Sequence, residues 1–486
     1  MALESTQATL AFLLSCAFKE LFASQRQLVI EHSIADGYFC HAADGKPLTS
    51  AEIERLESQL LRLVENETPL EFGTLPRRDV LADFTAKQSS SKLMIMEQWT
   101  VDPVPIVRFG RYWDYQIEPM ERDKRELKPF TLLQYQSGFI LRFPTLLDPG
   151  QLQPFRDCPK LFATFEEHER WGALLGVSTL GDLNRLIHND HSKEMMWVAE
   201  GLHEKKLSQL ADQIGADFPG RRLVTIAGPS ASGKTTFAKR LGIQLRVNGF
   251  QPISISMDDY FIDREKIPVD EEGNRDFESI KALDLDLLGV RINQLLVGEP
   301  VPKRKFDFET GRGYDTEQTM QLKDNCFILL EGIHGLNPLL SDMFGKDHLH
   351  QIYVSAITQL NIDATHRVST SDLRLLRRLC RDHKFRGYSP IETLLRWPSV
   401  RRGEEKNIFP YQEEANLMFN SSLVYELPVL CSYVKPLLQE VTGNGEIANK
   451  VQQLICLLTF LEPLEERLVP GISILREFIG KSEFDY

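Results

Sequence analysis

The chain has 486 residues, of which 42% are hydrophobic and 26% charged, and its formal net charge is −13. This length exceeds what one hydrophobic core usually serves, so we expect two or three globular domains. An acidic chain lacks the broad positive field on which nonspecific binding to nucleic acids or anionic membranes depends. We therefore expect neither nucleic acid nor a membrane as a partner.

Cysteine usage and hydropathy both predict a cytoplasmic protein. The seven cysteines are dispersed and form no Cys-x-x-Cys pair or other metal-ligand spacing, as expected for reduced thiols. The apolar stretch 10–22 lacks the features of a signal peptide, because Glu4 stands where positive charge belongs and residues 19–20 are charged. No run reaches the ~18 apolar residues that a membrane span needs. We expect a soluble, cytoplasmic protein whose first apolar stretch is a buried helix.

Residues 1–165 are predicted to form a small α+β domain. We expect helices at 5–24 and 49–67, and the second begins with a capping box in which Thr49 and Glu52 satisfy each other's backbone N–H groups. Aromatic and β-branched runs with Pro and Gly breaks predict strands. These runs lie at 104–115 and 130–143.

Two neighbouring segments of this region carry a resemblance to a known module. Residues 31–39 read EHSIADGYF and residues 47–57 read PLTSAEIERLE, so an aromatic pair after a glycine precedes a capped helix. This order resembles the second, editing-associated part of threonyl-tRNA synthetases. That module also carries a His-x-x-x-His pair on its first helix, which has no match here, so we interpret His32 and His41 as ordinary core or surface histidines. The resemblance implies a scaffold or recognition role.

The rest of the chain divides into three further parts. Residues 166–218 are strongly charged with helical spacing, and we interpret them as a helical linker with solvated faces. In residues 219–440 strands alternate with helices, which is typical of a parallel α/β sheet. Residues 441–486 are predicted to be a C-terminal helical segment, with an apolar stripe that packs on one of the domains.

The stretch 223–236 reads as strand, loop and helix. A β-branched run leads into a small, flexible turn, after which Phe237, Leu241 and Leu245 recur every four residues. The turn fits Gly-x4-Gly-Lys-Thr, whose backbone N–H groups wrap phosphates at the positive end of the new helix. A coincidental glycine turn is the alternative, but the flanking strand and helix argue against it. The nucleotide-binding residues would be Gly228, Pro229, Ser230, Ala231, Ser232, Gly233, Lys234, Thr235 and Thr236.

Within this loop two side chains have specific expected roles. Lys234 would reach the β- and γ-phosphates of ATP, and the hydroxyl of Thr235 would hold Mg²⁺. Further strands are expected at 252–256, 326–330 and 351–354, and Asp258 and Glu331 follow the first two of these. Ligands of open parallel sheets bind beyond the carboxyl ends of strands, so Lys234, Asp258 and Glu331 should converge on one crevice.

Two carboxylates compete for the role of catalytic base. Asp258 could take the proton from an attacking hydroxyl while the phosphoryl group moves in line, and its neighbour Asp259 is the alternative. Asp258 could instead act as a carboxylate near the metal, since both roles need an acid in the same place. Glu331 is the expected Mg²⁺ partner, because it follows a buried hydrophobic strand.

Four arginines fall at i, i+3, i+4 and i+7 and share one face of a predicted helix. Such a stripe is usually solvated when taken alone, but in a P-loop domain guanidinium groups can clamp phosphoryl oxygens and close as a lid. We favour the clamp for Arg377 and Arg381. The other two arginines of the stripe are Arg374 and Arg378.

These motifs together resemble the uridine kinase and phosphoribulokinase family of P-loop kinases. The loop 228–236, the segment 256–261, residues 331–333 and the arginine segment 374–387 occur in the order of that family. The resemblance implies ATP- and Mg²⁺-dependent phosphoryl transfer to a sugar hydroxyl, the 5′-hydroxyl in nucleosides, with Asp258 at the position of the base. The synthetase-like front part is similar to that of a bacterial nucleoside or uridine kinase group.

The chain departs from uridine kinases where the acceptor binds. Asp276-Phe277-Glu278 stands in place of an Asn-Phe-Asp segment whose acid holds the ribose, so the resemblance assigns Glu278 to the ribose. The segment 306–312 contains Arg312 but lacks the tyrosine and histidine that the family places near the base. A missing buried hydrogen bond can shift selectivity strongly, so uridine itself need not be the acceptor.

Three functions follow from this sequence. The first is a kinase that phosphorylates a nucleoside, and the second is a kinase of another sugar or sugar phosphate. The third is an ATP-operated regulatory or tRNA-binding protein in which the synthetase-like part recognises the partner, although the acidic balance and the arginine stripe argue against it. The sequence leaves open whether the protein forms a homo-oligomer.

Overall fold

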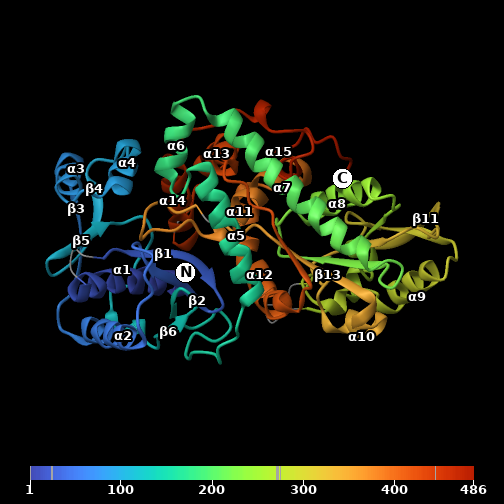
Figure 1. The fold of residues 1–486 in the computed structure, drawn as a ribbon, viewed down its shortest axis with the longest axis horizontal. Helices are drawn as coiled ribbons and strands as arrows, with labels where there is room; N and C mark the ends of the chain where they lie inside the picture. The colour runs from blue at the N-terminus through green and yellow to red at the C-terminus, as the bar shows by residue number, and fades with distance from the viewer. Residues whose placement is uncertain (1, 23–25, 270–272, 274, 359, 444) are drawn as a thin grey trace.

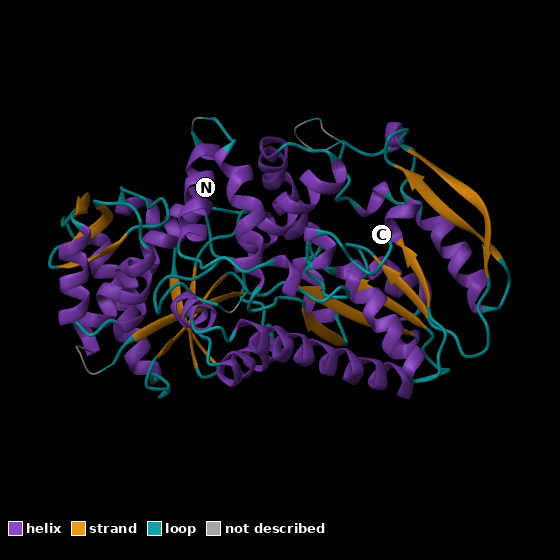
Figure 2. Cartoon of the chain, turned by 90° about the horizontal axis from the view of Figure 1, so that it is seen from above, coloured by secondary structure: helices purple, strands orange, loops and turns teal. Residues whose placement is uncertain are grey.

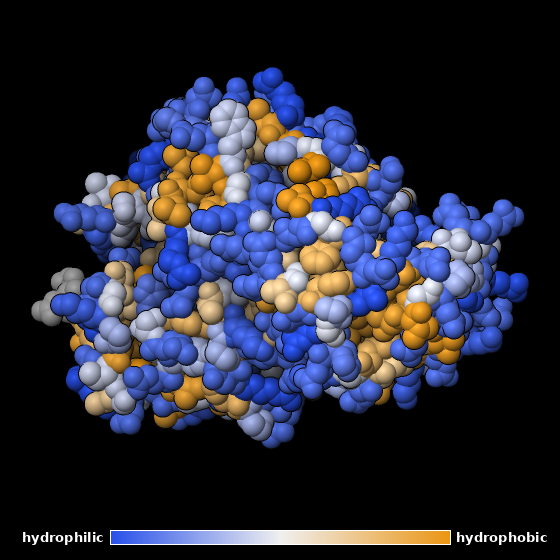
Figure 3. Space-filling model, turned by 45° about the vertical axis from the view of Figure 1, so that its right-hand side comes forward, coloured by the Kyte–Doolittle hydropathy of each residue, from blue (hydrophilic) through white to orange (hydrophobic). Residues whose placement is uncertain are grey.

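The computed structural model is elongated, with the N-terminal part at one end and the nucleotide-loop sheet at the other (Figure 1). It describes residues 2–22, 26–269, 273, 275–358, 360–443 and 445–486. The predicted end of the first helix, residues 23–24, lies outside this range. Most of the surface visible in Figure 3 is hydrophilic, and hydrophobic side chains gather there in separate patches.

The N-terminal part is an α+β unit, as predicted. Its larger sheet is antiparallel with the order β1-β2-β7-β6, and a second sheet has the order β3-β4-β5. Helices α1 and α2 bury their apolar faces on the larger sheet, and the capping box of Thr49 and Glu52 is formed. The elements are α1 (Ala2–Phe22), β1 (Leu28–Ile34), β2 (Gly37–Ala42), α2 (Ser50–Glu65), β3 (Leu70–Leu75), α3 (Arg77–Ala86), α4 (Ser90–Gln98), β4 (Val104–Phe109), β5 (Tyr112–Tyr115), β6 (Thr131–Tyr135) and β7 (Gly138–Arg142).

Three helices connect this unit to the parallel sheet: α5 (Pro159–Leu175), α6 (Leu180–His188) and α7 (Ser192–Ala216). The long helix α7 runs along one side of the molecule (Figure 2). The charged residues of α7 are only partly solvated, whereas the sequence predicted solvated helix faces in this region. Arg240, 2% exposed on the neighbouring helix α8, donates to Glu200 at 3.2 Å and to Glu204 at 2.7 Å. These ion pairs fasten α7 to the parallel-sheet unit.

A five-stranded parallel sheet forms the centre of the second half and has the order β14-β13-β8-β12-β9. The predicted strands are present. All five residues of β8 are buried, because this strand lies in the middle of the sheet. Sequence patterns missed the short edge strand β14 and the exposed ribbon of β10 and β11. The elements are β8 (Leu223–Ala227), α8 (Lys234–Val247), β9 (Ile253–Ser256), η3 (Met257–Tyr260), α9 (Leu285–Leu296), β10 (Val301–Asp307), β11 (Arg312–Met320), β12 (Ile328–Glu331), α10 (Pro338–Phe344), β13 (Leu349–Ser355), α11 (Thr370–Arg386), α12 (Pro390–Asn407) and β14 (Leu417–Asn420).

The C-terminal segment packs on this unit through α13 (Glu426–Gln439) and α14 (Glu446–Thr459). The predicted apolar stripe of α14 lies mostly inward, with Val451, Leu454 and Leu458 buried. Beyond α14 the chain is largely irregular and returns to the nucleotide loop, where the short helix α15 (Arg476–Ile479) lies against α11. Among the described helices, none is both long and apolar enough to span a bilayer.

Candidate active site

The loop between β8 and α8 has the shape that phosphate binding needs. A side chain at Gly228 would collide with the carbonyl oxygen of Val354, and Gly233 has φ +82°, which favours glycine. The backbone N–H groups of Gly233, Lys234 and Thr235 have no hydrogen-bond partner among the described residues. These donors stand at the positive N-terminal end of α8, so the loop fits the phosphates of a nucleotide.

Lys234 is held over its own loop. Its Nζ donates to the carbonyl oxygen of Pro229 at 3.2 Å. Burial lowers the pKa of the Lys234 ammonium, while the charges of Glu331 and Asp258 oppose this shift. The two carboxylates therefore lie close enough to act on Lys234, and the three predicted residues are brought to one crevice.

The two adjacent aspartates of η3 have different surroundings. Asp259 forms an ion pair with Lys305 at 3.2 Å. Asp258 is exposed to the crevice and has no hydrogen-bond or ion-pair partner among the described residues. The protein around it reduces its solvation and raises the pKa of its carboxyl, and Lys234 and Arg386 counteract the increase. Asp258 is thus the member of the pair that is free to accept a proton.

Glu331 ends β12, one strand away from Asp258. Its Oε1 accepts a hydrogen bond from Ser256 Oγ at 2.9 Å. Burial, together with the charge of Asp258, raises the pKa of Glu331 to about 7. Within the described residues, no cluster of three or more His, Cys, Asp or Glu side chains could hold a metal ion alone. A Mg²⁺ site with Thr235 and Glu331 would therefore be completed by phosphate oxygens and water, as is usual for this ion.

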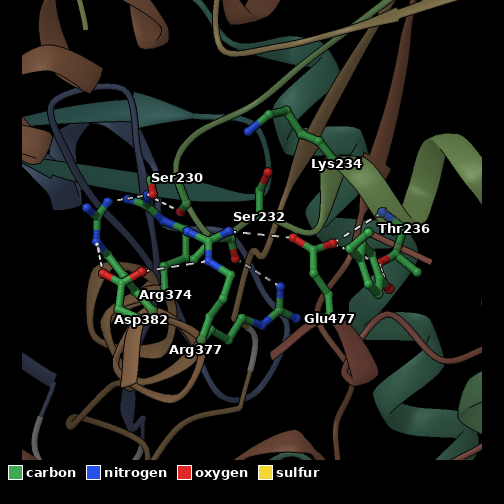
Figure 4. A network of polar contacts seen from close by, with 12 residues as sticks. Ser230, Ser232, Lys234, Thr236, Arg374, Arg377, Asp382 and Glu477 are labelled. Atoms are coloured by element: carbon green, nitrogen blue, oxygen red, sulfur yellow. Dashed lines mark hydrogen bonds and ion pairs between the residues drawn. The ribbon is translucent and has the colours of Figure 1, made fainter. Parts of the chain in front are cut away.

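Helix α11 supports the nucleotide loop from behind. Arg374 and Arg377 are 1% and 0% exposed, so the stripe is not solvated. Arg374 donates to the carbonyl oxygen of Ser230 at 3.1 Å and to Glu404 at 2.8 Å. Glu404 in turn accepts from the backbone N–H of Ser230 at 3.0 Å. Figure 4 shows these guanidinium groups grouped beside the loop.

Arg377 lies beneath the loop rather than above the crevice. Its guanidinium donates to Glu426 at 2.6 Å, to the carbonyl oxygen of Ser421 at 2.9 Å and to that of Ala231 at 3.3 Å. These partners occupy the guanidinium, so its geometry favours a positioning role for Arg377 over the expected contact with the transferred phosphate.

The outer arginines of the stripe lie closer to the crevice. Arg378 donates to Ser230 Oγ at 2.8 Å and pairs with Asp382 at 3.1 Å. Arg381 lies 3.6 Å from a carboxylate oxygen of Glu477, and its charge acts on both Lys234 and Asp258. Burial lowers the pKa of Arg381 to about 10. Of the two predicted clamp residues, Arg381 is the one whose charge acts on both Lys234 and Asp258.

The predicted acceptor residues lie in different places. Glu278 packs against Gly403 of α12, and burial raises the pKa of its carboxyl to about 7, with Glu404 and Asp258 adding to the increase. It therefore belongs to the crevice. Arg312 begins β11, is exposed, and acts electrostatically on Asp263 of the outer ribbon region. The structure does not bring Arg312 to Asp258.

The C-terminal segment adds a residue that sequence reasoning missed. Glu477 accepts from the backbone N–H of Thr236 at 3.2 Å and from its hydroxyl at 2.7 Å, as Figure 4 shows. The hydroxyl of Tyr486 lies 2.8 Å from the same threonine oxygen. A carboxylate thus occupies donors in the first turn of α8. No local pattern indicates this contact, because the residues are 241 positions apart.

The part of the chain that carries this site is similar to known proteins. Residues 223–426 match the model of the phosphoribulokinase / uridine kinase family. A uridine kinase of Staphylococcus aureus strain JH9 is 31% identical over 181 residues, which cover 37% of this chain and 77% of that protein. The solved structure of a possible uridine kinase from Bacillus stearothermophilus has 20% identity and a TM-score of 0.31, covering 44% of this chain and 98% of that one. A D-glycerate 3-kinase from Cryptococcus neoformans has 12% identity and a TM-score of 0.24, covering 57% and 87%.

Proposed function

The chain belongs to the phosphoribulokinase / uridine kinase family and is a P-loop small-molecule kinase, and we propose that it phosphorylates the 5′-hydroxyl of a nucleoside. ATP would supply the phosphoryl group and Mg²⁺ would neutralise its oxygens. The observation that carries the proposal is the carboxylate of Asp258, which has no hydrogen-bond or ion-pair partner in the described part of the chain and acts electrostatically on Lys234 of the nucleotide loop.

The residues of the loop would hold the phosphates. Unpaired N–H groups at the start of α8 and the ammonium of Lys234 supply donors and positive charge. Thr235 and Glu331 would hold Mg²⁺ through a hydroxyl and a carboxylate oxygen. Arg377 would keep the loop in place through the carbonyl oxygen of Ala231, because its guanidinium already has buried partners.

The acceptor side would be served by carboxylates and one arginine. Asp258 would remove the proton of the acceptor hydroxyl, and its raised pKa suits a group that must take up a proton. Arg381 would stabilise negative charge on the transferred group, since its charge acts on Lys234 and Asp258. Glu278 would accept hydrogen bonds from ribose hydroxyls. Arg312 would need to approach from the outer ribbon, so its predicted contact with the acceptor has the least support.

A panel of acceptors tests the proposal. The protein is incubated with Mg²⁺ and ATP labelled at the γ-phosphate, together with each of the common ribonucleosides and with free ribose, fructose and glycerate as non-nucleoside controls. We expect label on a nucleoside. Label only on a sugar or sugar acid would replace the nucleoside by that acceptor, and release of free phosphate without any labelled acceptor would contradict a kinase that uses one of these compounds.

A further inference from the structure

A second cavity lies away from the nucleotide loop, where α5, α7 and the end of β14 meet the N-terminal part. Its volume is about 140 Å³. Lys234, Asp258 and Glu331 are not among its lining residues, so it is separate from the proposed active site. The N-terminal part contributes Glu31 and His32, α5 contributes Phe165 and Trp171, and α7 contributes Ala199 and His203.

Flat rings form much of the wall. The ring of His32 stacks on Phe165 with centroids 3.3 Å apart, and the ring of His168 lies 4.0 Å from that of Trp171. These rings pack on one another, so a planar ligand would meet the parts of them that line the cavity, and ring contacts there would add to the burial of its surface. The volume is close to the ~150 Å³ of an engineered apolar cavity that holds benzene, so one six-membered ring fits.

Lining residues of this cavity carry buried polar atoms that have no partner among the described residues. His203, 1% exposed, has its Nε2 within 3.1 Å of the carbonyl oxygen of Ser422. Because a carbonyl oxygen can only accept, Nε2 carries the proton, and Nδ1 presents a lone pair without a partner among the described residues. Thr358 Oγ1, in a residue 6% exposed, also lacks a partner. A buried acceptor without a hydrogen bond costs free energy. A ligand that donates an N–H group to it would remove this cost.

The charges of the lining residues restrict the chemical class of the ligand further. Carboxylates of Glu31, Glu169 and Glu426 line the cavity, and its lining residues include no lysine or arginine. Glu426 is paired with Arg377 at 2.6 Å and Glu31 with His41 at 3.1 Å, whereas Glu169 has no ion-pair partner among the described residues. Burial also lowers the pKa values of His168, to about 3, and of His203, so these imidazoles are neutral. Phosphates and carboxylates would find no lysine or arginine among the lining residues, whereas a neutral or cationic ligand would meet no repulsion.

We propose that this cavity is a binding site for a planar, single-ring nitrogen heterocycle that carries N–H donors and no negative charge. The ring side chains would contact the ligand, the Nδ1 of His203 would accept one of its N–H groups, and the exposed carboxylate of Glu169 at the rim would favour its amino edge. A free pyrimidine base with an amino group is the simplest member of this class.

Calorimetric titration of the full chain tests the site without any readout of activity. The probes are cytosine, pyrimidine, which has the same ring without N–H groups, and orotate, which adds a carboxylate. We expect cytosine to bind at least tenfold more tightly than pyrimidine and orotate not to bind. Equal binding of all three, or no binding of cytosine at millimolar concentration, would overturn the proposal.

Amino-acid substitutions test whether cytosine binds in this cavity. Ala199→Met should fill the cavity and His203→Phe should remove the acceptor, so each should weaken cytosine binding at least tenfold, with circular dichroism verifying the fold. Trp197→Phe is the matched control, because Trp197 is 67% exposed on the same helix. Asp258→Asn should leave cytosine binding unchanged. Loss of binding in Asp258→Asn with retention in His203→Phe would assign the base to the acceptor site and refute the second site.

Discussion

Two adjacent aspartates at the end of β9 differ only in their surroundings. Asp259 is neutralised by Lys305 at 3.2 Å, whereas Asp258 faces the crevice without a partner and has a raised pKa. A carboxylate that is paired with an ammonium is a weaker base than one that is poorly solvated and unpaired. Chemistry at this site therefore depends on where each side chain points rather than on its type.

Asp258→Asn should lower kcat by about 10²–10⁴-fold, the usual contribution of a general base, and should leave the affinity for ATP nearly unchanged. The measurement is steady-state transfer of phosphate to the acceptor found in the panel, with ATP affinity from titration. Asp259→Asn is the matched control and should retain most of the activity. Normal turnover of Asp258→Asn would remove this residue from the base role.

The stability of the ligand-free protein should depend on Glu278 in a pH-sensitive way. Its pKa is raised from 4.5 to about 7 by burial and by the charge of Glu404. Between these values the folded protein holds a proton that the unfolded chain has lost, so the contribution to stability is present at low pH and lost as the pH rises through 7. Glu278→Gln should thus raise the free energy of unfolding by about 1–3 kcal/mol near pH 8 and change it little near pH 5.

Denaturant unfolding at the two pH values measures this difference. Gln keeps the shape of the protonated side chain, so packing against Gly403 should be preserved. An equal effect of Glu278→Gln at both pH values would show that the carboxyl does not titrate between them.

At the scale of elements, α11 is the support of the nucleotide loop. Its arginines are buried only because carboxylates from α12 and α13 meet them, Glu404 for Arg374 and Glu426 for Arg377. A buried charge without its partner costs far more than a buried pair. The stripe is therefore a structural layer between the loop and the helices behind it.

Arg377→Met should destabilise the protein by about 3–5 kcal/mol, since it leaves the carboxylate of Glu426 buried and unpaired. Chemical unfolding monitored by circular dichroism measures the loss. The double variant Arg377→Met/Glu426→Gln should recover part of the stability, because it removes the stranded charge. A double variant that is as unstable as the sum of the single ones would contradict this pairing.

The segment that contains α15 contacts the first turn of α8. The carboxylate of Glu477 accepts from two donors of Thr236 that an incoming phosphate could also use. Glu477→Gln should remove the competing negative charge and tighten binding of a non-hydrolysable ATP analogue by about 3–10-fold, a range expected for one charge near a helix terminus. Titration calorimetry in Mg²⁺ buffer measures this, and Glu483→Gln, at an exposed position, is the control. Weaker binding by Glu477→Gln would instead identify Glu477 as a support of the site.

At the scale of the whole molecule, a buried polar network joins the N-terminal part to the parallel-sheet unit. Tyr115 of β5 donates its hydroxyl to Asp363, which lies beyond β13 and also pairs with His366 at 3.0 Å. Burial would raise the pKa of Asp363, but His366 and Lys92 outweigh it and hold the pKa well below its usual range. The two parts of the chain therefore share a buried charge.

Tyr115→Phe should lower the free energy of unfolding by about 1–2 kcal/mol, because it removes a hydrogen bond to a buried, charged acceptor. Thermal and denaturant unfolding measure the change. Tyr112→Phe is the control, since its hydroxyl accepts a hydrogen bond from the exposed Arg111, and its effect should stay within about 0.5 kcal/mol. An unchanged free energy of unfolding for Tyr115→Phe would mean that the hydrogen bond from Tyr115 to Asp363 does not couple the two parts.

Short-range patterns determined much of this protein. The run at 223–236 specifies its strand, loop and helix because β-branched residues, glycines and four-residue spacing act locally, and the order of motifs identified the kinase family. The capping box at Thr49 was predicted for the same reason. The resemblance of residues 1–165 to a synthetase module, the division of the chain into four parts and the acceptor remain predictions.

Tertiary structure alone decided which side chains are free and which are occupied. Periodicity placed Arg377 and Arg381 on one helix face, yet only the tertiary structure shows that Arg377 is held by Glu426 while the charge of Arg381 acts on Asp258. Likewise Glu477 reaches Thr236 from 241 positions away. Burial and pairing are set by residues distant in sequence, and they determine which charges remain available for chemistry.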